Sequence, residues 1–317
     1  MRFSFRVLSS FLVLVTTTQV IFSEIKSVEN SIVRVSVDLD KGCSLVEFTD
    51  LSSGVNTINS YDLGRQVQAS FYSGPSGYDG CVWNSQEWSW NPIGSGDAYG
   101  NPSTVLGFDS GADYIACTIL PKQWACNNVD CECTFDLRYT IENNMMRGQV
   151  QLNNNRSDKN EYGQYLQEIP AVYVNGFLYR LFGYTGNSPW TYDQLTEWDA
   201  SFDGISWYPG TVYDITENFM MFAAEDGFAV GVYNAGNDVV GFNGGFAGEK
   251  GKGGPSDSNT GYISPVASLE LTSDITYNYG YTLIMGDMDT VRKTVYSLHA
   301  QQLNNPLRDF NSTIGRL

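Results

Sequence analysis

Two glutamates precede apolar segments of the sequence, at positions where a carboxyl group could transfer protons. Glu168 precedes the apolar segment 169–174, and Glu217 precedes a segment that begins at Phe219. Burial disfavours the ionised form of a carboxyl group, so a glutamate buried there has a raised pKa and suits general acid catalysis. The structural alternative for both is a bond to an arginine or to backbone amides. A third candidate catalytic carboxylate, Asp97, lies in a loop rich in glycine.

The segment 83–101 combines tryptophans with amide and carboxylate side chains. Indole rings form flat apolar platforms, and neighbouring amides donate and accept hydrogen bonds, which together suit sugar rings. The alternative is a long loop that packs its own tryptophans as a small separate core. The candidate binding residues in this loop are Trp88, Trp90 and Asn91.

Strand alternation predicts that polar side chains of the segments 66–72 and 171–175 line one groove. If residues 66–72 form a strand, its even-numbered side chains are polar and share one face, while its odd-numbered side chains are apolar. Leaving such polar groups buried without partners would cost about 1–3 kcal/mol each, and a water-filled groove avoids that cost. We expect loop 83–101 to close over the end of this groove and Glu168 to reach it. The candidate binding residues outside that loop are Arg65, Gln68, Tyr72, Asn175 and Tyr262, with Tyr173 as a further catalytic candidate on the face of Asn175.

Two ways of cleaving a glycosidic bond fit these residue types. Hydrolysis needs an acid and a second carboxylate, which Glu168, Glu217 and Asp97 could provide. β-Elimination at a uronic acid needs a base and a cation or amide that neutralises the substrate carboxylate. Because an acidic protein repels a polyanionic substrate, we rank hydrolysis slightly ahead. The candidates for the base are Tyr72, Tyr173 and Tyr262, and those for the neutralising group are Arg65, Gln68 and Asn91.

The body of the chain alternates short strand-like segments with clusters of Gly, Asn, Asp and Ser. Such punctuation is typical of antiparallel sheets, and the amphipathic helices that an α/β fold needs between its strands are missing. We therefore expect an all-β, antiparallel β-sandwich of the supersandwich type, formed by a single domain over residues 24–317. The expected strands are 31–39, 44–49, 66–72, 114–120, 134–141, 146–153, 171–175, 219–224, 228–233 and 277–285.

One C-terminal helix is expected over residues 289–301. Its apolar positions Val291, Val295 and Leu298 follow helical spacing. The single histidine of the chain, His299, falls in its last turn, where we interpret it as a surface or capping residue. The segment 249–259 is the most loop-like stretch of the chain and is interpreted as a rim.

Residues 1–23 have the layout of a secretory signal peptide. Arg2 and Arg6 precede an apolar stretch that gives way to small and polar residues up to Ser23. The stretch is shorter than the roughly 20 apolar residues that span a bilayer, and no later segment is long and apolar enough to span one. We expect cleavage near Ser23, an extracellular protein without a membrane span, and glycosylation at the sequons of Asn155 and Asn311.

Six cysteines, an even number, indicate disulfides in a secreted chain. The sequence does not choose among their possible pairings. Cys131 and Cys133 would point to the same side of a strand, so we expect each to pair elsewhere. A thiolate metal cluster over 126–133 is the alternative, but no second cluster or histidine lies nearby. The six are Cys43, Cys81, Cys117, Cys126, Cys131 and Cys133.

The net charge and the single histidine of the chain argue against several classes of partner, catalytic site and metal site. The 317 residues include 18 Lys and Arg against 35 Asp and Glu, a formal net charge of −17. Nucleic acids and anionic membranes attract basic surfaces, so neither is an expected partner. Every Ser-His-Asp or Cys-His scheme, and most histidine metal sites, would depend on His299 alone. We expect neither a metal nor a cofactor.

Several long blocks resemble a largely uncharacterised group of secreted proteins associated with carbohydrate degradation. The resemblance covers about residues 30–295 and implies a β-sandwich of the galactose-mutarotase-like supersandwich type, which also occurs as a domain of several polysaccharide lyases and glycosidases. No catalytic residues of the group are available for transfer to this chain. True mutarotases of this fold use histidines beside a carboxylate, and the lack of those histidines argues against mutarotase activity. The blocks are GRQVQASFYSGP (64–75), WNPIGSGDAYGNPS (90–103), PKQWAC (121–126), NNRSDKNEY (154–162), QEIPAVYVNGFLYRL (167–181) and TGYISP (260–265).

Together these features favour a secreted carbohydrate-active enzyme, a glycoside hydrolase or polysaccharide lyase, that acts on a polysaccharide or oligosaccharide. The alternative is a carbohydrate-binding or extracellular structural protein without catalysis, because the same aromatic and amide side chains serve binding equally well. Glu168 and Glu217 in one pocket would favour the enzyme. A flat row of tryptophans without paired carboxylates would favour the binding protein.

Overall fold

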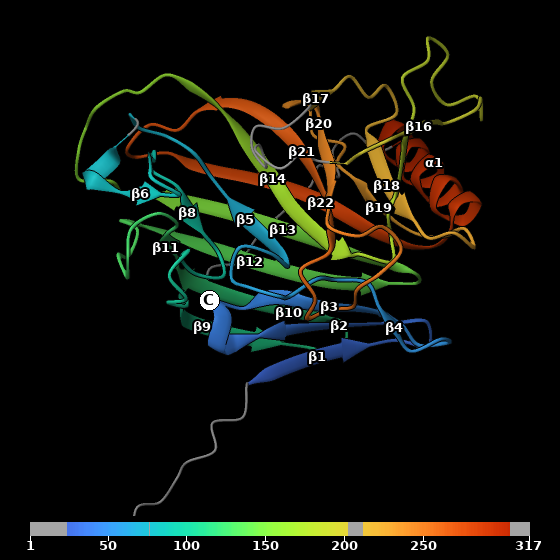
Figure 1. Cartoon of the computed structure of the whole chain (residues 1–317), viewed down its shortest axis with the longest axis horizontal. Helices are drawn as coiled ribbons and strands as arrows, with labels where there is room; N and C mark the ends of the chain where they lie inside the picture. Colours follow the sequence, from blue (N-terminus) through green and yellow to red (C-terminus); the bar gives the residue numbers. More distant parts are fainter. Residues whose placement is uncertain (1–23, 76, 202–211, 305–317) are drawn as a thin grey trace, which may run out of the picture.

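The computed structural model of the protein describes residues 24–75, 77–201 and 212–304. In this part of the chain, two large sheets of eleven and nine strands pack face to face, beside a small two-stranded hairpin (Figure 1). Neighbouring strands of both large sheets pair antiparallel. The expected all-β antiparallel sandwich is therefore confirmed. The expected signal peptide, residues 1–23, lies outside the described residues.

The eleven-stranded sheet, here called sheet 1, carries the polar segments singled out in the sequence. Its strand order is β1-β2-β3-β5-β14-β21-β20-β17, with β4, β8 and β11 paired beside this path. Its strands are β1 (Ile25–Glu29), β2 (Val33–Asp38), β3 (Ser44–Asp50), β4 (Val55–Asn56), β5 (Val67–Ser70), β8 (Pro92–Ile93), β11 (Lys122–Gln123), β14 (Gln164–Asn175), β17 (Val212–Tyr213), β20 (Val239–Ala247) and β21 (Thr260–Glu270).

The nine-stranded sheet, here called sheet 2, covers the inner face of sheet 1. Its order is β16-β15-β18-β19-β22-β13-β12-β10-β9. Its strands are β9 (Thr104–Ser110), β10 (Tyr114–Leu120), β12 (Cys133–Glu142), β13 (Met145–Asn154), β15 (Arg180–Gly183), β16 (Thr196–Trp198), β18 (Phe219–Ala223), β19 (Phe228–Tyr233) and β22 (Thr276–Asp287). Outside the large sheets lie the 3-10 turns η1 (Leu39–Lys41) and η2 (Tyr78–Gly80) and the hairpin of β6 (Val82–Trp83) and β7 (Gln86–Glu87).

The main core lies between the two sheets and follows strand alternation. Val67, Ala69 and Phe71 of the β5 segment point into this core, as the alternation predicted. From sheet 2, alternate residues of β12 such as Phe135 and Leu137 meet them. Fully burying one large apolar side chain contributes about 1.5–3 kcal/mol, so this inner face is a major source of stability.

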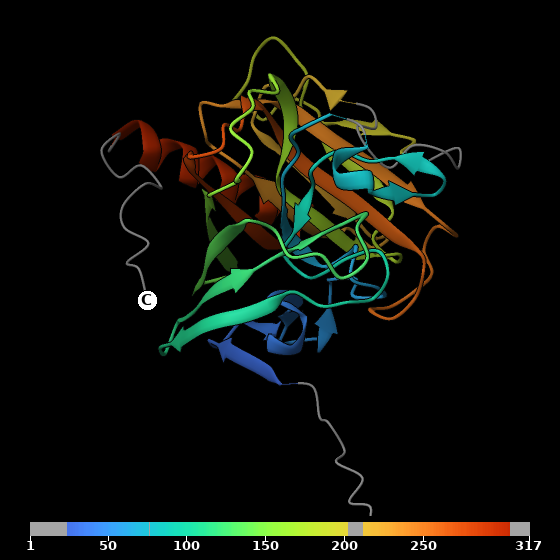
Figure 2. The same cartoon turned by 90° about the vertical axis from the view of Figure 1, so that its left-hand side faces the viewer.

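The α-helix α1 (Met288–Asn304) confirms the expected C-terminal helix and extends it at both ends. Val291, Val295 and Leu298 pack on the outer face of sheet 2, over β18, β19 and β22 (Figures 1 and 2). His299 stacks on Trp190 with ring centroids 3.6 Å apart. No helix among the described residues is long and apolar enough to cross a membrane.

Three disulfides join the six cysteines, and two of them connect distant parts of the fold. Cys43, beside β3 of sheet 1, pairs with Cys117 in β10 of sheet 2 and so links the two sheets. Cys81, before β6, pairs with Cys126, after β11. Three disulfides are compatible with an extracellular protein.

The third disulfide corrects one sequence prediction, because Cys131 and Cys133 pair with each other. Two residues of extended strand span about 6.6 Å, which would hold the two thiols apart on one face. The chain instead bends at Glu132, before β12 begins, and the two Cα atoms lie 5.1 Å apart. This distance falls within the usual range for a disulfide.

A one-residue bulge interrupts β14 where it crosses the centre of sheet 1. Glu168 pairs with Ser70 and Ala171 with Gln68, so three steps along β14 match two steps along β5. The extra residue reverses the alternation, because a bulge leaves one residue unpaired and re-aims the side chains beyond it. The bulge therefore puts Glu168 on the same face of the sheet as Ala171, although their separation is odd.

The strands β20 and β21 were not expected from the sequence, and Pro265 explains the failure for β21. A proline inside a segment argues against a central strand because it cannot donate a ladder hydrogen bond. In sheet 1, Ile263 pairs with Val172 and Val266 with Glu168, so Pro265 lies opposite the bulge, where the ladder is already interrupted. The sheet therefore tolerates the missing backbone N–H of Pro265 at this position.

Removing the disulfide between the sheets should destabilise the protein more than removing the local one. Cys43 and Cys117 are 74 residues apart, and we expect their double alanine variant to lose about 4 kcal/mol of unfolding free energy. The control is the double alanine variant of Cys131 and Cys133, which close a loop of only two residues and should lose much less. Urea denaturation measures both, and equal losses would contradict the prediction.

Candidate functional site

A pocket of about 360 Å³ lies on the outer face of sheet 1, the face turned away from sheet 2. This volume is at the lower end of the range of roughly 300–1,000 Å³ typical of small-molecule sites. Its floor is polar, one wall is formed by indole rings, and its rim carries an acidic and a basic residue. The floor comprises Gln68, Ser70, Tyr72, Glu168 and Tyr173; the indole wall comprises Trp83, Trp88 and Trp124; the rim comprises Asp62 and Arg65.

The floor comes from two neighbouring strands whose polar faces coincide. The even-numbered residues 68, 70 and 72 line the pocket, while the odd-numbered ones enter the core. On β14, Val172 and Val174 enter the core and Tyr173 faces the pocket. The bulge then brings Glu168, five residues before Tyr173, onto the same face. The structure thus brings together Arg65, Gln68, Tyr72, Glu168 and Tyr173, which the sequence analysis proposed as one groove; their catalytic and binding roles stay predictions.

Glu168 is a buried carboxyl group at the floor of the pocket, with 4 % of its surface exposed. Its Oε2 accepts a hydrogen bond of 2.9 Å from the hydroxyl of Tyr72, and its Oε1 accepts one from the hydroxyl of Tyr262. Burial raises the pKa of Glu168, although hydrogen bonds from Ser70, Tyr262 and Tyr72 oppose this by favouring the ionised form. The group can therefore hold a proton at a pH where an exposed glutamate is ionised.

Two tyrosines, Tyr173 and Tyr262, lie beside Glu168. Tyr262 lies under Glu168 in β21, is 1 % exposed, and does not line the pocket itself. Its ring lies beside that of Tyr173, with centroids 5.1 Å apart. Burial, and after it the neighbouring Glu168, raise the pKa of both hydroxyls well above the usual value. Neither tyrosine is suited to act as a base near neutral pH.

The indole wall packs against a disulfide. Trp83 packs edge-on against Trp88 and Trp124, with ring centroids 5.2 and 5.6 Å apart. The Cys81–Cys126 disulfide belongs to the same small cluster and connects the two loops that carry these rings. The tryptophans therefore form a satellite core and still present partly exposed rings to the pocket.

Asn91 fixes one edge of this wall. It accepts a hydrogen bond of 3.1 Å from the indole nitrogen of Trp88 and donates one of 2.8 Å to the carbonyl of Phe71. It thereby joins the wall to β5, and its amide is engaged within the protein.

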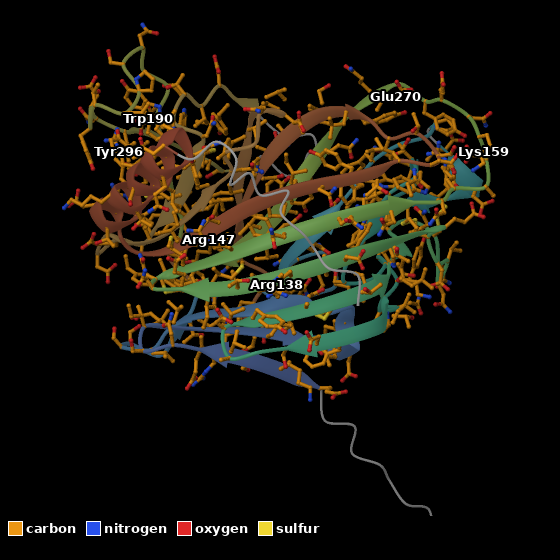
Figure 3. The ribbon with its side chains drawn as sticks, turned by 180° about the vertical axis from the view of Figure 1, so that it is seen from behind. Arg138, Arg147, Lys159, Trp190, Glu270 and Tyr296 are labelled. Atoms are coloured by element: carbon orange, nitrogen blue, oxygen red, sulfur yellow. A yellow bond between two sulfur atoms is a disulfide. The ribbon has the colours of Figure 1, made fainter. Side chains whose placement is uncertain are left out.

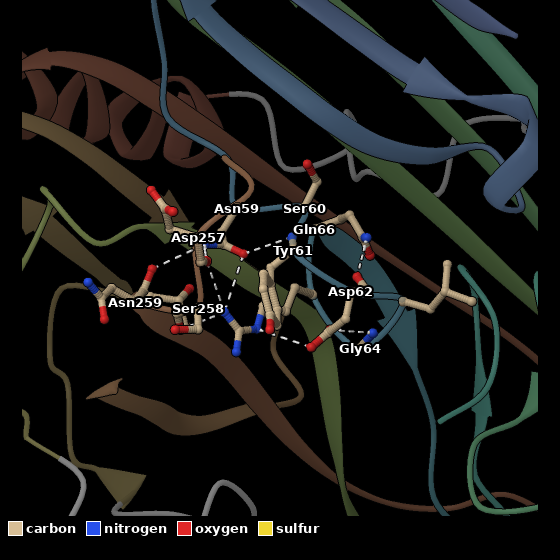
Figure 4. Close-up of polar contacts among 12 residues, drawn as sticks. Asn59, Ser60, Tyr61, Asp62, Gly64, Gln66, Asp257, Ser258 and Asn259 are labelled. Carbon is tan, nitrogen blue, oxygen red and sulfur yellow. Dashed lines mark hydrogen bonds and ion pairs between the residues drawn. The ribbon is translucent and has the colours of Figure 1, made fainter. Parts of the chain in front are cut away.

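Arg65 at the rim is bonded to other groups of the protein, and its partners Asn59, Asp62, Asp257 and Ser258 are labelled in Figure 4. Its Nη1 donates a hydrogen bond of 2.7 Å to the carbonyl of Ser258 and longer ones to Asp257 and Asn59. Its Nε lies 3.6 Å from a carboxylate oxygen of Asp62. Through these contacts Arg65 connects the rim of the pocket to residues 257 and 258, which belong to the loop segment 249–259 of the sequence analysis.

Asp97 lies outside the pocket and organises its own loop. Its Oδ1 accepts the backbone amides of Tyr99 and Asn101, and its Oδ2 accepts the amide of Asn128. These donors are consistent with the loop geometry, because an aspartate readily caps backbone amides within a turn. The structure therefore places Asp97 as a loop-forming residue that does not line the pocket.

Glu217 also lies outside the pocket, in a buried ion pair beside α1. Both of its carboxylate oxygens contact Nη2 of Arg292, at 3.1 and 3.2 Å. One of them also accepts hydrogen bonds from the hydroxyl of Tyr296 and the backbone amide of Trp190, which lie together on this side of the molecule (Figure 3). The helix and the β6 hairpin lie at opposite ends of the long axis (Figure 1). Glu168 and Glu217 are therefore not in one pocket, the arrangement that would have favoured an enzyme, and Glu217 is the counter-ion of Arg292.

Four further predicted residues lie away from the pocket or outside the described part. Trp90 is fully buried in the main core beside Arg156, and Asn175 donates a hydrogen bond to the carbonyl of Asn56 from a buried position. Asn155 is exposed, so its glycosylation stays a prediction, whereas Asn311 lies outside the described residues.

Sequence reasoning did not select Asp62, Trp83 or Trp124 as site residues. Trp124 comes from a segment far from β5 in sequence. The pairing of Cys81 with Cys126 connects its loop to loop 83–101, and so does a hydrogen bond of 2.8 Å from the backbone amide of Trp124 to the carbonyl of Asn91. Knowledge of that pairing would have pointed to Trp83 and Trp124 together. Among the described residues, no group of three or more His, Cys, Asp or Glu side chains is placed to hold a metal ion.

The chain matches no protein-family model and no curated protein. It is similar in structure to a candidate aldose 1-epimerase from Escherichia coli K12, with a TM-score of 0.51 and 8 % identity over 84 % of this chain and 100 % of that one. A galactose mutarotase-like protein from Lactobacillus casei gives a TM-score of 0.49 and 11 % identity, over 83 % and 100 % of the two chains. A galactose mutarotase-related enzyme from Lactobacillus acidophilus gives 0.46 and 12 %, over 84 % and 99 %. The first likeness shows a mutarotase-like sandwich fold, which confirms that part of the expected resemblance.

Replacing Glu217 should destabilise the fold strongly. Glu217→Gln leaves the charge of Arg292 buried without its counter-ion, which typically costs about 3–5 kcal/mol. The matched control is Glu197→Gln, because Glu197 forms an exposed pair with Arg180 that is expected to contribute about 0–1 kcal/mol. Urea denaturation of both variants checks the prediction, which fails if the two losses are similar.

The ionisation of Glu168 should make stability fall with rising pH. The pKa of Glu168 is raised in the folded state, so its contribution is complete below its unfolded pKa of about 4.3 and is lost as pH rises through the folded pKa. Glu168→Gln cannot ionise and lacks this loss. We expect the unfolding free energy of the wild type, minus that of the variant, to decrease from about pH 4 upward. Denaturation at several pH values measures it, and a difference that is flat or rises with pH would refute the assignment.

Proposed function

We propose that the protein binds a saccharide in this pocket and hydrolyses a glycosidic bond there, with Glu168 as the general acid. One observation carries the proposal: a buried carboxyl group, whose pKa burial raises, lies at the polar floor of an open pocket that has an indole wall. Aromatic walls stack on the apolar faces of sugar rings, while the floor can hydrogen-bond their hydroxyls. The mutarotase-like fold adds support, because the similar Escherichia coli protein is described as a candidate aldose 1-epimerase.

The proposed reaction uses Glu168 in its protonated form. Its proton would pass to the glycosidic oxygen as the bond to the anomeric carbon breaks, and water would add to that carbon. Tyr72 and Tyr262 would then stabilise the resulting carboxylate, since each already donates to one of its oxygens. The environment that keeps the acid protonated thus also supports the charge that forms when the proton leaves.

A second carboxylate for the reaction would be Asp62. It lines the same pocket, with its side chain 48 % exposed, and it replaces Glu217 and Asp97 in that role. An exposed carboxylate can accept a proton from the attacking water. We further propose that the protein is secreted and meets its substrate, an oligosaccharide or polysaccharide, outside the cell.

The second candidate function is saccharide binding without catalysis. The observation that favours it is the separation of the carboxylates that the sequence had suggested as partners. Of these, Glu217 is held by Arg292 and Asp97 by its own loop. The indole wall and the amides of the pocket would serve such a protein equally well.

A panel of polysaccharides and oligosaccharides separates the two functions. We expect the wild type to release new reducing ends from one member, and Glu168→Gln to lose at least about a hundredfold in rate with its binding affinity little changed. The control Glu270→Gln alters a carboxylate that is absent from the pocket lining and should keep full activity.

Binding without turnover in the wild type would replace the hydrolase by the binding protein. Activity of Glu168→Gln within a few-fold of the wild type would exclude Glu168 as the acid. Trp88→Ala should weaken binding, and circular dichroism verifies that each variant is folded.

A further inference from the structure

We infer that the pocket selects a short, uncharged saccharide and discriminates against uronic acids, which excludes β-elimination as its chemistry. The inference rests on the proposed function of the pocket as a saccharide site. It follows from three features: the contacts of Arg65, which is the cationic side chain of the described lining, the other charges of the pocket, and the volume of the pocket.

Among the described residues that line the pocket, Arg65 is the one that carries a positive charge. Its side chain is 13 % exposed and its Nε lies 3.6 Å from Asp62, while its Nη1 donates to the carbonyl of Ser258 (Figure 4). A substrate carboxylate that binds Nη1 or Nε of Arg65 would compete with these contacts. Its place in the structure is that of a positioning residue.

The remaining charges of the pocket oppose an anionic ligand. Asp62 stands at the rim, and Glu168 at the floor is neutral or negative depending on pH. A carboxylate brought into the pocket would lose its hydration without gaining an ion pair, which is unfavourable. The formal net charge of −17 adds repulsion at long range.

The tyrosine chemistry of the pocket also fits poorly with elimination. Elimination removes the proton beside the uronate carboxylate, so it needs a base and a group that stabilises the negative charge. The candidate bases were Tyr72, Tyr173 and Tyr262. Burial raises the pKa of Tyr173 and Tyr262 well above the usual value, and the hydroxyl of Tyr72 donates to the carboxyl group of Glu168. Of the two candidate amide neutralisers, Gln68 and Asn91, Asn91 is already bonded to Trp88 and Phe71.

The size of the pocket indicates a short ligand. A volume of about 360 Å³ is small for a groove that follows a long polymer. The indole wall and the floor of β5 and β14 enclose the same space, so one face of a sugar ring can stack while its hydroxyls meet Gln68 and Ser70. The pocket therefore fits one or two neutral sugar units.

The test compares matched neutral and charged sugars on the folded, disulfide-bonded protein. The probes are disaccharides of gluco, manno and galacto configuration, each measured by calorimetry beside its counterpart with a carboxylate at C6. We expect at least one neutral probe to bind, and its charged counterpart to bind at least about tenfold more weakly. Asp62→Asn should narrow this difference, because it removes a negative charge from the rim.

The outcomes distinguish this inference from the proposed function. Equal or tighter binding of the C6-carboxylate probes would overturn the selection of neutral sugars and leave the saccharide pocket in place. No binding of either set, with circular dichroism showing a folded protein, would overturn both.

The role of Arg65 is tested by Arg65→Gln. If Arg65 is a positioning residue, Arg65→Gln should lower the binding affinity for neutral and charged probes by similar factors. A loss confined to the charged probes would show that Arg65 binds a substrate carboxylate and would overturn the inference. Arg65→Lys, which keeps the charge but not the forked donor geometry, should recover little of the neutral binding.

Discussion

The two-residue alternation of side chains along a strand is the constraint on which this structure depends. On sheet 1 it sends valines and a phenylalanine inward to the core and polar residues outward to the pocket. The bulge in β14 is the one place where the site requires the alternation to reverse. Without that extra residue Glu168 and Tyr173 would face opposite sides of the sheet, and the pocket would lack its buried carboxyl group.

The two buried glutamates show how the surroundings decide what a carboxyl group does. Glu217 meets Arg292, Tyr296 and a backbone amide, so its charge is satisfied and it connects α1 to the sandwich. Within the described part of the chain, Glu168 meets the hydroxyl donors of Tyr72, Tyr262 and Ser70, and burial raises its pKa. Both were equivalent in sequence, as acidic residues before apolar strands. The ion pair with Arg292 gives Glu217 a structural role. No ion pair of Glu168 is found among the described residues, so its carboxyl group is able to exchange a proton.

The pocket walls come from loops that the disulfides and side-chain contacts hold in place. Cys81–Cys126 unites two loops that carry tryptophans, and Asn91 joins one of these loops to β5. Arg65 holds the opposite rim through carbonyl groups of segment 257–258. Because loops have no regular ladder of hydrogen bonds, such specific contacts are what give the pocket a defined shape.

The sequence by itself determined the all-β sandwich, the C-terminal helix and the polar face of β5, because strand and helix periods are local properties of the chain. It also indicated that Glu168 could approach that face. Tertiary structure alone decided that Glu217 pairs with Arg292, that Cys131 pairs with Cys133, and that Trp124 joins the indole wall. Each of these depends on a bend or on a contact between segments far apart in sequence. Local periodicity contains no information about such contacts, so only the folded chain could reveal them.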